Sequence, residues 1–259
     1  MHGLGNDFVV IDLISQSAKL YANHIIRIAD RRLGIGCDQV LLIEPPIRSD
    51  ADFYYRIFNP DGQEVEQCGN GARCAARFFY DSGFTNQQTL QADCLAGPLE
   101  FTIDAPDLIT AKMGTPKFKE SLSYPITIDN TEFLIHAVSM GNPHAILLVP
   151  NIESAPVDKI GPLLSKHSFF PNETNVGFMQ IIDRQHIRLR VYERGAGETL
   201  ACGSGACAAV VAGICLGLLD SSVQVSFLKG NINITWEGKG APVYMQGPAI
   251  SVFMGRFLL

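Results

Sequence analysis

The sequence predicts an α+β fold of two pseudo-symmetric domains, each a curled, mostly antiparallel sheet around a central helix. Three observations lead to this prediction: an internal repeat, many short runs rich in β-branched and aromatic residues, and two helices that each begin directly after a cysteine–glycine turn. These helices are expected at about 70–82 and 204–219. The second is apolar on all sides, and only a helix enclosed by protein tolerates such a surface.

The repeat is clearest around two cysteines. Arg56–Ala75 reads RIFNPDGQEVEQCGNGARCA, and Arg190–Ala209 reads RVYERGAGETLACGSGACAA. Both follow the pattern R-x-[FY]-x5-E-x3-C-G-x-G-A-x2-A without a gap. Two weaker matches precede the cysteines: LGN at 4–6 with MGN at 140–142, and IGCDQ at 35–39 with VGFMQ at 176–180. Because solenoid repeats are much shorter, the pattern indicates one duplicated unit of about 110–130 residues.

The duplication predicts two domains, residues 1–114 and 115–247. The boundary is expected within Lys112–Pro125, a stretch that holds Gly114 and Pro116. A second crossing near Gly247-Pro248 would return the tail, residues 248–259, to the first domain. We therefore expect each domain to carry one copy of the cysteine–glycine turn.

Composition narrows the function classes. The chain has 259 residues, of which 47% are hydrophobic and 18% charged, so it can bury a full core and is not a disordered or fibrous protein. Its net charge of −6 comes with no basic cluster, which argues against nucleic acid or an anionic membrane as a partner. No targeting signal or membrane-spanning run is evident, so we expect a cytoplasmic protein with a small zwitterionic or neutral ligand.

The seven cysteines are expected to be free thiols, because the count is odd and nothing indicates secretion. Five of them are interpreted as small buried packing groups: Cys37, Cys74, Cys94, Cys207 and Cys215. Cys68 and Cys202 differ from these because both occupy the same turn in both copies of the repeat. We therefore expect these two thiols to carry the function.

The chemistry of the turns supports that expectation. In each copy the cysteine stands at or just before a helix N-terminus, where unpaired N–H groups and the helix dipole stabilise a thiolate or a bound carboxylate. Glycines on the C-terminal side, such as Gly69 and Gly203, let a ligand approach the backbone. A reactive thiol beside a carboxylate seat is the result.

Three functions compete for this pair of turns. Zinc binding is disfavoured because the spacings C-x5-C and C-x4-C do not match a zinc knuckle and fall out of register between the copies. A phosphate-binding loop is disfavoured because no Lys-Ser/Thr follows the glycines. The third function is a pair of acid/base thiols that face one cleft from opposite sides, which suits inversion at a carbon that bears a hydrogen. The residues therefore favour a racemase or epimerase.

The sequence resembles the diaminopimelate epimerase family over essentially its full length. The matching stretches are MHGLGNDF at 1–8, RIFNPDGQEVEQCGNGARC at 56–74, SMGNPH at 139–144, TNVGFMQ at 174–180 and RVYERGAGETLACGSGACAA at 190–209. The resemblance implies a PLP-independent, metal-free isomerase with no cofactor, which interconverts LL- and meso-2,6-diaminopimelate for lysine and peptidoglycan synthesis. It also implies that Cys68 and Cys202 are the two acid/base residues.

The resemblance further implies the substrate contacts. The carboxylate of the reacting centre falls to Gly69, Asn70, Gly203 and Ser204. The other contacts are Asn6, Gln39, Asn59, Asn142, Asn175, Glu193 and Arg194. Arg194 suits the distal carboxylate and Glu193 the distal ammonium, and His144 and Glu193 are implied to tune the two thiol pKa values. Arg56 and Arg190 are interpreted instead as structural partners of Glu64 and Glu198.

Two rivals and one departure accompany this assignment. The rival enzyme is a proline or hydroxyproline epimerase, and the rival without catalysis is an amino-acid-binding module whose cysteines only pack. Asn59 could also merely start a turn at Pro60-Asp61-Gly62, and His144 could be purely structural. The family resemblance implies a homodimer, yet Phe253 stands where a tyrosine is expected at the dimer contact.

Overall fold

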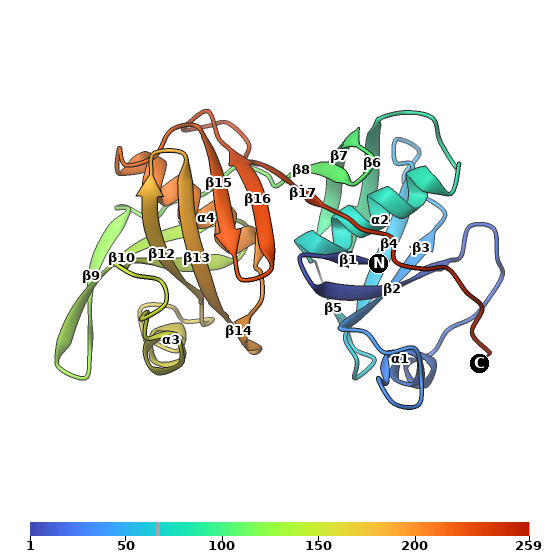
Figure 1. Ribbon diagram of the computed structural model, residues 1–259, viewed down its shortest axis with the longest axis horizontal. Helices are drawn as coiled ribbons and strands as arrows, with labels where there is room; N and C mark the ends of the chain where they lie inside the picture. The colour runs from blue at the N-terminus through green and yellow to red at the C-terminus, as the bar shows by residue number, and fades with distance from the viewer. Residues whose placement is uncertain (66–67, 259) are drawn as a thin grey trace. The chain divides into compact units, whose positions relative to one another are not determined.

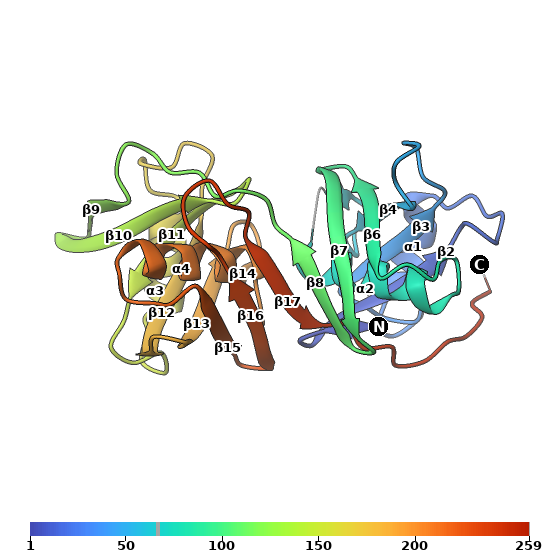
Figure 2. The same ribbon diagram turned by 90° about the horizontal axis from the view of Figure 1, so that it is seen from above.

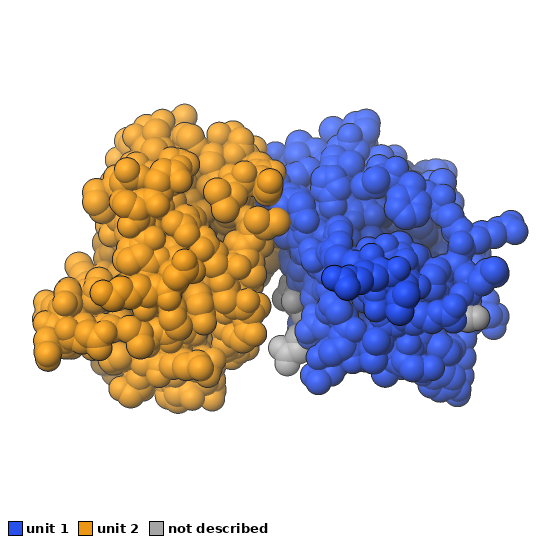
Figure 3. Space-filling model, turned by 60° about the horizontal axis from the view of Figure 1, so that its bottom comes forward, with its two compact units in different colours: residues 1–111, 246–259 blue, residues 112–245 orange. Residues whose placement is uncertain are grey.

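The computed structural model describes residues 1–65 and 68–258. The chain divides into two compact units: residues 1–111 with 246–259 form unit 1, and residues 112–245 form unit 2 (Figure 3). Residues 66 and 67, inside the first cysteine motif, lie outside the described part. Within that part, no helix has both the length and the apolar character needed to cross a bilayer.

Unit 1 begins with a hairpin and contains two helices, one before and one after its central strands (Figure 1). Its elements are β1 His2–Gly3, β2 Asn6–Asp12, α1 Ala22–Ala29, β3 Gln39–Glu44, β4 Phe53–Phe58, β5 Glu64–Val65, α2 Gly69–Asp81, β6 Thr89–Cys94, β7 Gly97–Ala105 and β8 Leu108–Lys112.

Unit 2 repeats this series after one additional strand at its start. Its elements are β9 Ser123–Ile128, β10 Thr131–Ser139, β11 Pro143–Leu148, α3 Val157–Ser165, β12 Asn175–Asp183, β13 His186–Glu193, β14 Gly197–Thr199, α4 Gly203–Cys215, β15 Ser222–Phe227, β16 Gly230–Thr235 and β17 Tyr244–Pro248. The last strand continues into the tail that belongs to unit 1.

The two units connect their strands in the same way. In unit 1, β2 pairs with β3 and β4 with β6 in parallel; in unit 2, β11 pairs with β12 and β13 with β15 in parallel. A helix lies between the members of each parallel pair because parallel neighbours need a long crossover connection. The other pairs are antiparallel. The predicted α+β fold with mostly antiparallel sheets is confirmed.

The strand register corrects one part of the predicted repeat. Phe8 lies opposite Gln39 in unit 1, and His144 lies opposite Asn175 in unit 2, so Gln39 corresponds to Asn175. The sequence comparison had matched Gln39 with Gln180, five residues further along β12. That match followed a shared glycine and glutamine, whereas the true counterparts differ in side chain. The cysteine motifs themselves correspond as predicted, with Ile57 opposite Val65 and Val191 opposite Thr199.

The two helices that follow the cysteines pack against the sheets of their own units. α2 contacts β1 to β4 and β7, and α4 contacts β10 to β13 and β16 (Figure 2). α4 buries every residue except Ser204, Ile214 and Cys215, as its apolar surface predicts. It ends earlier than predicted, because Gly217 adopts a left-handed φ of 72°. The N–H groups of Gly217 and Leu218 then bond back to Ile214 and Gly213, which closes the helix end.

The other two helices cover a second face of each sheet, and the sequence had not predicted them. α1 packs Ile25, Ile28 and Ala29 against β3 and β4, while α3 joins a cluster that includes Val176 and Phe178 of β12. A strand predicted at 250–253 is absent from the described structure, where Ile250 makes a single bridge to His2. Each unit therefore buries α2 or α4 on one side of its sheet and α1 or α3 on another.

Candidate active site

Both predicted catalytic cysteines occupy the residue that immediately precedes a helix. Cys68 caps the N-terminus of α2 and Cys202 that of α4, each with an extended backbone. The first intrahelical bonds run from Ala72 N–H to the Cys68 carbonyl and from Ala206 N–H to the Cys202 carbonyl. The preceding N–H groups of each first turn have no intrahelical acceptor. Each turn thus combines a thiol with donors that suit an anion.

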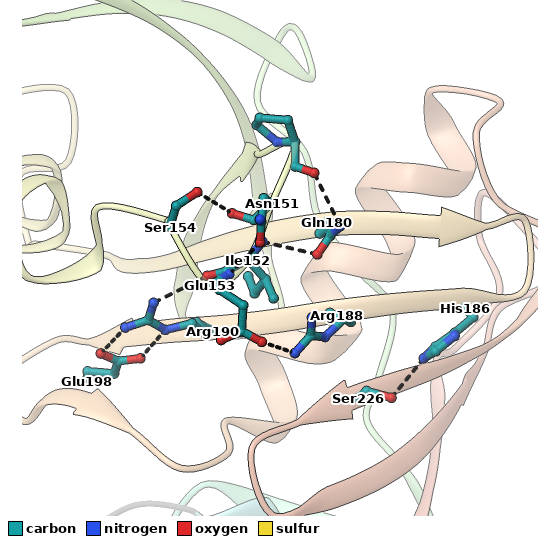
Figure 4. A network of polar contacts seen from close by, with 11 residues as sticks. Asn151, Ile152, Glu153, Ser154, Gln180, His186, Arg188, Arg190, Glu198 and Ser226 are labelled. Carbon is teal, nitrogen blue, oxygen red and sulfur yellow. Dashed lines mark hydrogen bonds and ion pairs between the residues drawn. The ribbon is translucent and has the colours of Figure 1, made fainter.

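Two matching ion pairs hold the short strands that lead into these turns. Arg56 donates to both carboxylate oxygens of Glu64 at 2.9 and 2.7 Å, and Arg190 donates to those of Glu198 at 2.6 and 2.8 Å. Arg190 also donates to the carbonyl of Ile152, ahead of α3 (Figure 4). The prediction that these arginines are structural partners of the glutamates is confirmed. The pairs fix β5 on β4 and β14 on β13.

In unit 1 the Cys68 thiol is tied to a chain of amides. Cys68 Sγ donates to Asn6 Oδ1 at 3.5 Å, and Asn70 Nδ2 donates to the same oxygen at 3.4 Å. Asp38 accepts from Asn6 Nδ2 at 3.0 Å, which sets the orientation of that amide. The buried Arg73 donates to Asn70 Oδ1 at 2.7 Å and orients the second amide. The structure therefore places three predicted site residues in one contact network.

Gln39 and Asn59, two further predicted substrate contacts, lie together in unit 1. Gln39 Nε2 donates to Asn59 Oδ1 at 2.9 Å. The Asn59 carbonyl also accepts from Gly62 N–H at 2.9 Å, so the predicted turn at this point is present as well. Asn59 thus starts a turn with its backbone and presents an amide with its side chain.

In unit 2 a chain of donors points toward the Cys202 sulfur. His144 Nε2 lies 3.1 Å from Asn142 Oδ1, and Asn142 Nδ2 donates to Ser204 Oγ at 3.4 Å. Ser204 Oγ lies 3.7 Å from Cys202 Sγ. Burial lowers the pKa of His144 to about 3, so its imidazole is neutral at pH 7 and donates through Nε2. Its hydrogen-bonding contribution favours the thiolate of Cys202.

A carboxylate acts on the same sulfur in the opposite direction. Burial and the charge of Glu193 raise the pKa of Cys202 well above its ordinary value, and only 6% of this residue is exposed. The helix N-terminus alone predicts a lowered thiol pKa, but burial and the carboxylate outweigh it here. Glu193 in turn accepts a hydrogen bond from Thr199 Oγ1 at 2.5 Å. Cys202 is therefore a thiol between one arm that favours its proton and another that favours its charge.

Asn175 and Arg194 complete the predicted set in unit 2. Arg194 N–H donates to Asn175 Oδ1 at 2.9 Å, and Asn175 Nδ2 donates to the Pro143 carbonyl at 3.4 Å. The Arg194 guanidinium donates to the Asn172 carbonyl at 2.9 Å. This contact holds a partly solvated cation beside the turn that carries Glu193.

The remaining cysteines are structural, with one correction. Burial raises the pKa of Cys37 to about 11 and that of Cys74 to about 12, so neither ionises at neutral pH. Cys94 is also buried, whereas Cys215 is exposed at the last position of α4 and is not the packing group that was expected. Among the described residues, no cluster of three or more His, Cys, Asp or Glu side chains is placed to hold a metal.

Sequence reasoning missed two residues that orient the site. Asp38 fixes Asn6, and Thr199 contacts Glu193. Asp38 lies beside the predicted Gln39 and gave no signal of its own. Thr199 could have been found by asking where the two copies of the repeat differ in polarity, because Val65 occupies its position in unit 1.

Comparison with known proteins agrees with these features. The family model described as diaminopimelate epimerase matches residues 1–119 and 136–252. The diaminopimelate epimerase of Nitrosospira multiformis is 52% identical over 269 aligned positions, which cover 100% of this chain and 97% of the relative. That of Nitrosomonas europaea is 54% identical over 265 positions, which cover 98% and 96%.

Solved structures with much lower identity share the fold. A hydroxyproline epimerase from Agrobacterium vitis has a TM-score of 0.68 at 17% identity, over 95% of this chain and 87% of that one. A probable proline racemase from Agrobacterium radiobacter has a TM-score of 0.70 at 17% identity, over 100% and 91%. These likenesses concern the fold alone. With the family model and the full-length relatives at about half identity, they show that the chain belongs to the diaminopimelate epimerase family.

Proposed function

We propose that this protein interconverts LL- and meso-2,6-diaminopimelate, with Cys68 and Cys202 as the two acid/base residues. The observation that carries the proposal is the pair of matching turns, each with a cysteine at a helix N-terminus, in a chain of the diaminopimelate epimerase family. In this proposal the two domains, residues 1–114 with the tail 248–259 and residues 115–247, present their turns to opposite faces of one stereocentre. The product serves lysine and peptidoglycan synthesis.

The proposed reaction moves two protons and needs no cofactor or metal. The thiolate of one cysteine removes the α-proton from one face of the substrate, and its sulfur becomes a thiol. The electron pair left on carbon spreads into the α-carboxylate, which Gly69, Asn70, Gly203 and Ser204 receive at the two helix N-termini. The thiol of the other cysteine then gives its proton to the opposite face and becomes a thiolate. Reversal of these roles returns the first epimer.

The environment of Cys202 supports a specific resting state. Its raised pKa favours the neutral thiol, so Cys202 is the proton donor before substrate binds and Cys68 is the base. When Cys202 gives up its proton, the donors that lead from His144 through Asn142 and Ser204 stabilise the new thiolate. The two arms around this sulfur therefore match the two charge states that the reaction requires.

The position of Glu193 supports pKa tuning over its other expected role. Its carboxylate acts on the Cys202 thiol, which places it beside the reacting centre and away from a distal ammonium. The remaining predicted contacts, Asn6, Gln39, Asn59, Asn142, Asn175 and Arg194, then hold the rest of the substrate. In this proposal Arg194 exchanges its bond to the Asn172 carbonyl for the distal carboxylate.

Product formation tests this function against its rivals. Purified protein is incubated separately with LL-diaminopimelate, L-proline and trans-4-hydroxy-L-proline, and the epimers are resolved by chiral chromatography. Formation of meso-diaminopimelate, with no inversion of the cyclic substrates, is expected because a monocarboxylate gives Arg194 nothing to bind. Inversion of proline or hydroxyproline alone would replace the proposal with the rival enzyme. Binding of all three without any inversion would favour a binding module.

We also propose that the protein forms a homodimer in the cytoplasm. The tail after β17 exposes several apolar side chains, with Phe253 69% and Met254 90% exposed. A second copy would cover such a surface, and a reducing compartment keeps the catalytic thiols active. Sedimentation of the wild type as a dimer and of Phe253→Ser as a monomer is the expected result. A monomeric wild type at micromolar concentration would contradict it.

A further inference from the structure

The hairpin of β13 and β14 places Thr199 where its hydroxyl reaches Glu193. Val191 lies opposite Thr199 in the ladder, and Glu193 is two residues beyond Val191 on the same face of the strand. A diagonal neighbour in an antiparallel pair is within reach of a long side chain. Thr199 Oγ1 accordingly donates to Glu193 Oε1 at 2.5 Å.

The same strand face meets the N-terminus of α4. A Cβ added at Gly205 would lie 3.2 Å from Val191 Cγ2 and 3.3 Å from Cys202 Sγ, so glycine is needed where the strand and the sulfur meet. Glu193 extends this face by one further outward position and acts on the Cys202 thiol through its charge and a hydrogen bond. Thr199, Glu193 and Cys202 therefore form a series in which the first residue contacts only the second.

Unit 1 lacks this series at the matching positions. Val65 stands in the place of Thr199, and Asn59 stands in the place of Glu193. Asn59 is oriented from β3, by the 2.9 Å bond that it accepts from Gln39. The hydroxyl and the carboxylate thus occur together in unit 2 and are both replaced in unit 1. Such paired replacement indicates that the hydroxyl serves the carboxylate.

We propose that Thr199 is a positioning residue, whose hydroxyl fixes the Glu193 carboxylate against Cys202 and so keeps the proton on that thiol until it is transferred. The inference rests on the proposed function of Cys202. No bond is formed or broken by Thr199: Glu193 stays a carboxylate throughout, and the proton that leaves Cys202 goes to the substrate carbon. Loss of the hydroxyl removes a donor from a charged acceptor, which frees the carboxylate to rotate or to take up a proton.

Other ionisable groups near Cys202 do not duplicate this role. His144, which reaches the sulfur through Asn142 and Ser204, is buried and neutral at pH 7. The Arg194 guanidinium donates to the Asn172 carbonyl. The charge that acts on the pKa of Cys202 among the described residues is that of Glu193. Whatever weakens Glu193 therefore moves the Cys202 titration toward lower pH.

Peptide-resolved alkylation of Cys202 tests the inference without depending on turnover. Thr199→Val and Thr199→Ser are compared with wild type for the pH dependence of iodoacetamide labelling, read by mass spectrometry on the peptide that contains Cys202. Thr199→Val is expected to shift the labelling midpoint down by about one pH unit and to lower kcat about tenfold, with KM within about twofold of wild type. Thr199→Ser, which keeps the hydroxyl, is expected to retain both wild-type values.

Two controls separate positioning from general damage. Thr110→Val removes a similar hydroxyl–carboxylate bond, from Thr110 Oγ1 to Asp104 Oδ2 at 2.6 Å in unit 1, and is expected to leave the Cys202 midpoint and kcat unchanged. Adding Thr199→Val to Glu193→Gln is expected to have no further effect on the midpoint, because the partner is already lost.

The outcomes that would overturn the inference differ from those that would overturn the proposed function. An unchanged midpoint in Thr199→Val, an equal loss in Thr199→Ser, or full additivity with Glu193→Gln would each contradict a positioning role. The wild type failing to epimerise diaminopimelate would instead remove the proposed function, and the alkylation result would then still report on the Thr199–Glu193–Cys202 series.

Discussion

Units 1 and 2 share a topology and a cysteine turn but surround their two thiols differently. Each unit places its cysteine at the N-terminus of an enclosed helix and anchors the preceding strand with an arginine–glutamate pair. Within this common frame, matched positions carry different chemistry: Asn59 and Glu193, Val65 and Thr199, Phe8 and His144, Asn70 and Ser204, and Arg73 and Cys207.

The difference separates two requirements of a two-thiol mechanism. The duplicated frame supplies equal geometry, which inversion requires because each face of the carbon must meet a sulfur. The diverged side chains supply unequal charge, since a useful resting state holds one thiol neutral and the other ionised. Unit 2 combines a carboxylate and a buried neutral imidazole around Cys202, whereas unit 1 surrounds Cys68 with amides.

Removing either thiol is expected to have the largest effect and to break the comparison most directly. Cys68→Ala and Cys202→Ala should each lower the rate of inversion by about 10²–10⁴-fold, because each removes one acid/base group. The remaining thiol still faces one side of the carbon, so one variant should exchange the α-hydrogen of the LL epimer and the other that of the meso epimer. Proton NMR in D₂O measures the exchange. Two variants that exchange the same epimer would contradict sulfurs on opposite faces.

The His144 imidazole makes the stability of unit 2 sensitive to acid. Its folded pKa of about 3 lies below the ordinary 6.5, so its contribution to stability is complete above pH 6.5 and is lost as pH falls toward 3. The expected loss is about 1.4 kcal/mol for each pH unit in this window. Urea unfolding followed by the fluorescence of Trp236, the single tryptophan and buried in unit 2, measures it.

The matched substitution for this prediction comes from unit 1, where Phe8 occupies the equivalent position. In His144→Phe the acid-dependent part of the loss that belongs to this imidazole should disappear, while the contributions of the carboxylates remain. Identical pH profiles for wild type and variant would show that His144 is protonated in both states or in neither.

The two arginine–glutamate pairs should differ in strength because they differ in exposure. The Arg190 and Glu198 side chains are each 21% exposed, against 35% and 27% for Arg56 and Glu64. With allowance for solvent screening, Arg190→Met is expected to cost about 2 kcal/mol and Arg56→Met about 1 kcal/mol. Urea denaturation monitored by circular dichroism measures both. A larger cost for Arg56→Met would reverse the ranking and contradict the argument from burial.

The smallest expected effects concern the ends of the two central helices. Gly83 follows α2 with a φ of 74°, and Gly217 follows α4 with a φ of 72°. A Cβ added at either glycine meets nothing within 4 Å, so only the left-handed backbone opposes a side chain. Gly83→Ala and Gly217→Ala should each lower the free energy of unfolding by about 1 kcal/mol. A markedly unequal pair of values would indicate packing differences that the local structure does not contain.

The parts of the fold that the sequence predicts are those that duplication preserved. Identical residues at fixed spacing reveal the cysteine turns, the following helices and the arginine–glutamate pairs. The helix α3 escaped prediction because Gly161 and Pro162 lie inside it. Gly161 is explained only by the tertiary structure, since a Cβ there would lie 2.7 Å from the Tyr192 ring. Helix α1 has eight residues, too few for its periodicity to distinguish it from a loop.

The site shows the same division. The two thiols, their carboxylate seats and several amides could be assigned from the repeat and the family resemblance. The equivalence of Gln39 and Asn175 could not, because the strand pairing that defines it is not visible in residue identity. Thr199 and Asp38 escaped for a related reason: each acts through another side chain, and the contact exists only after the strands have paired. Divergence between repeats is thus a signal for function that identity searches discard.

The transfer of hydrogen during a single inversion tests the two-thiol account most directly. Wild-type protein is mixed with protiated LL-diaminopimelate in D₂O, and the first few per cent of meso product is analysed together with the recovered substrate. Because one sulfur takes the proton and a different, solvent-equilibrated sulfur returns one, the product should carry deuterium at the inverted carbon while the recovered substrate stays protiated. A product that retains the original proton would show a single base acting on both faces, and the account would be wrong.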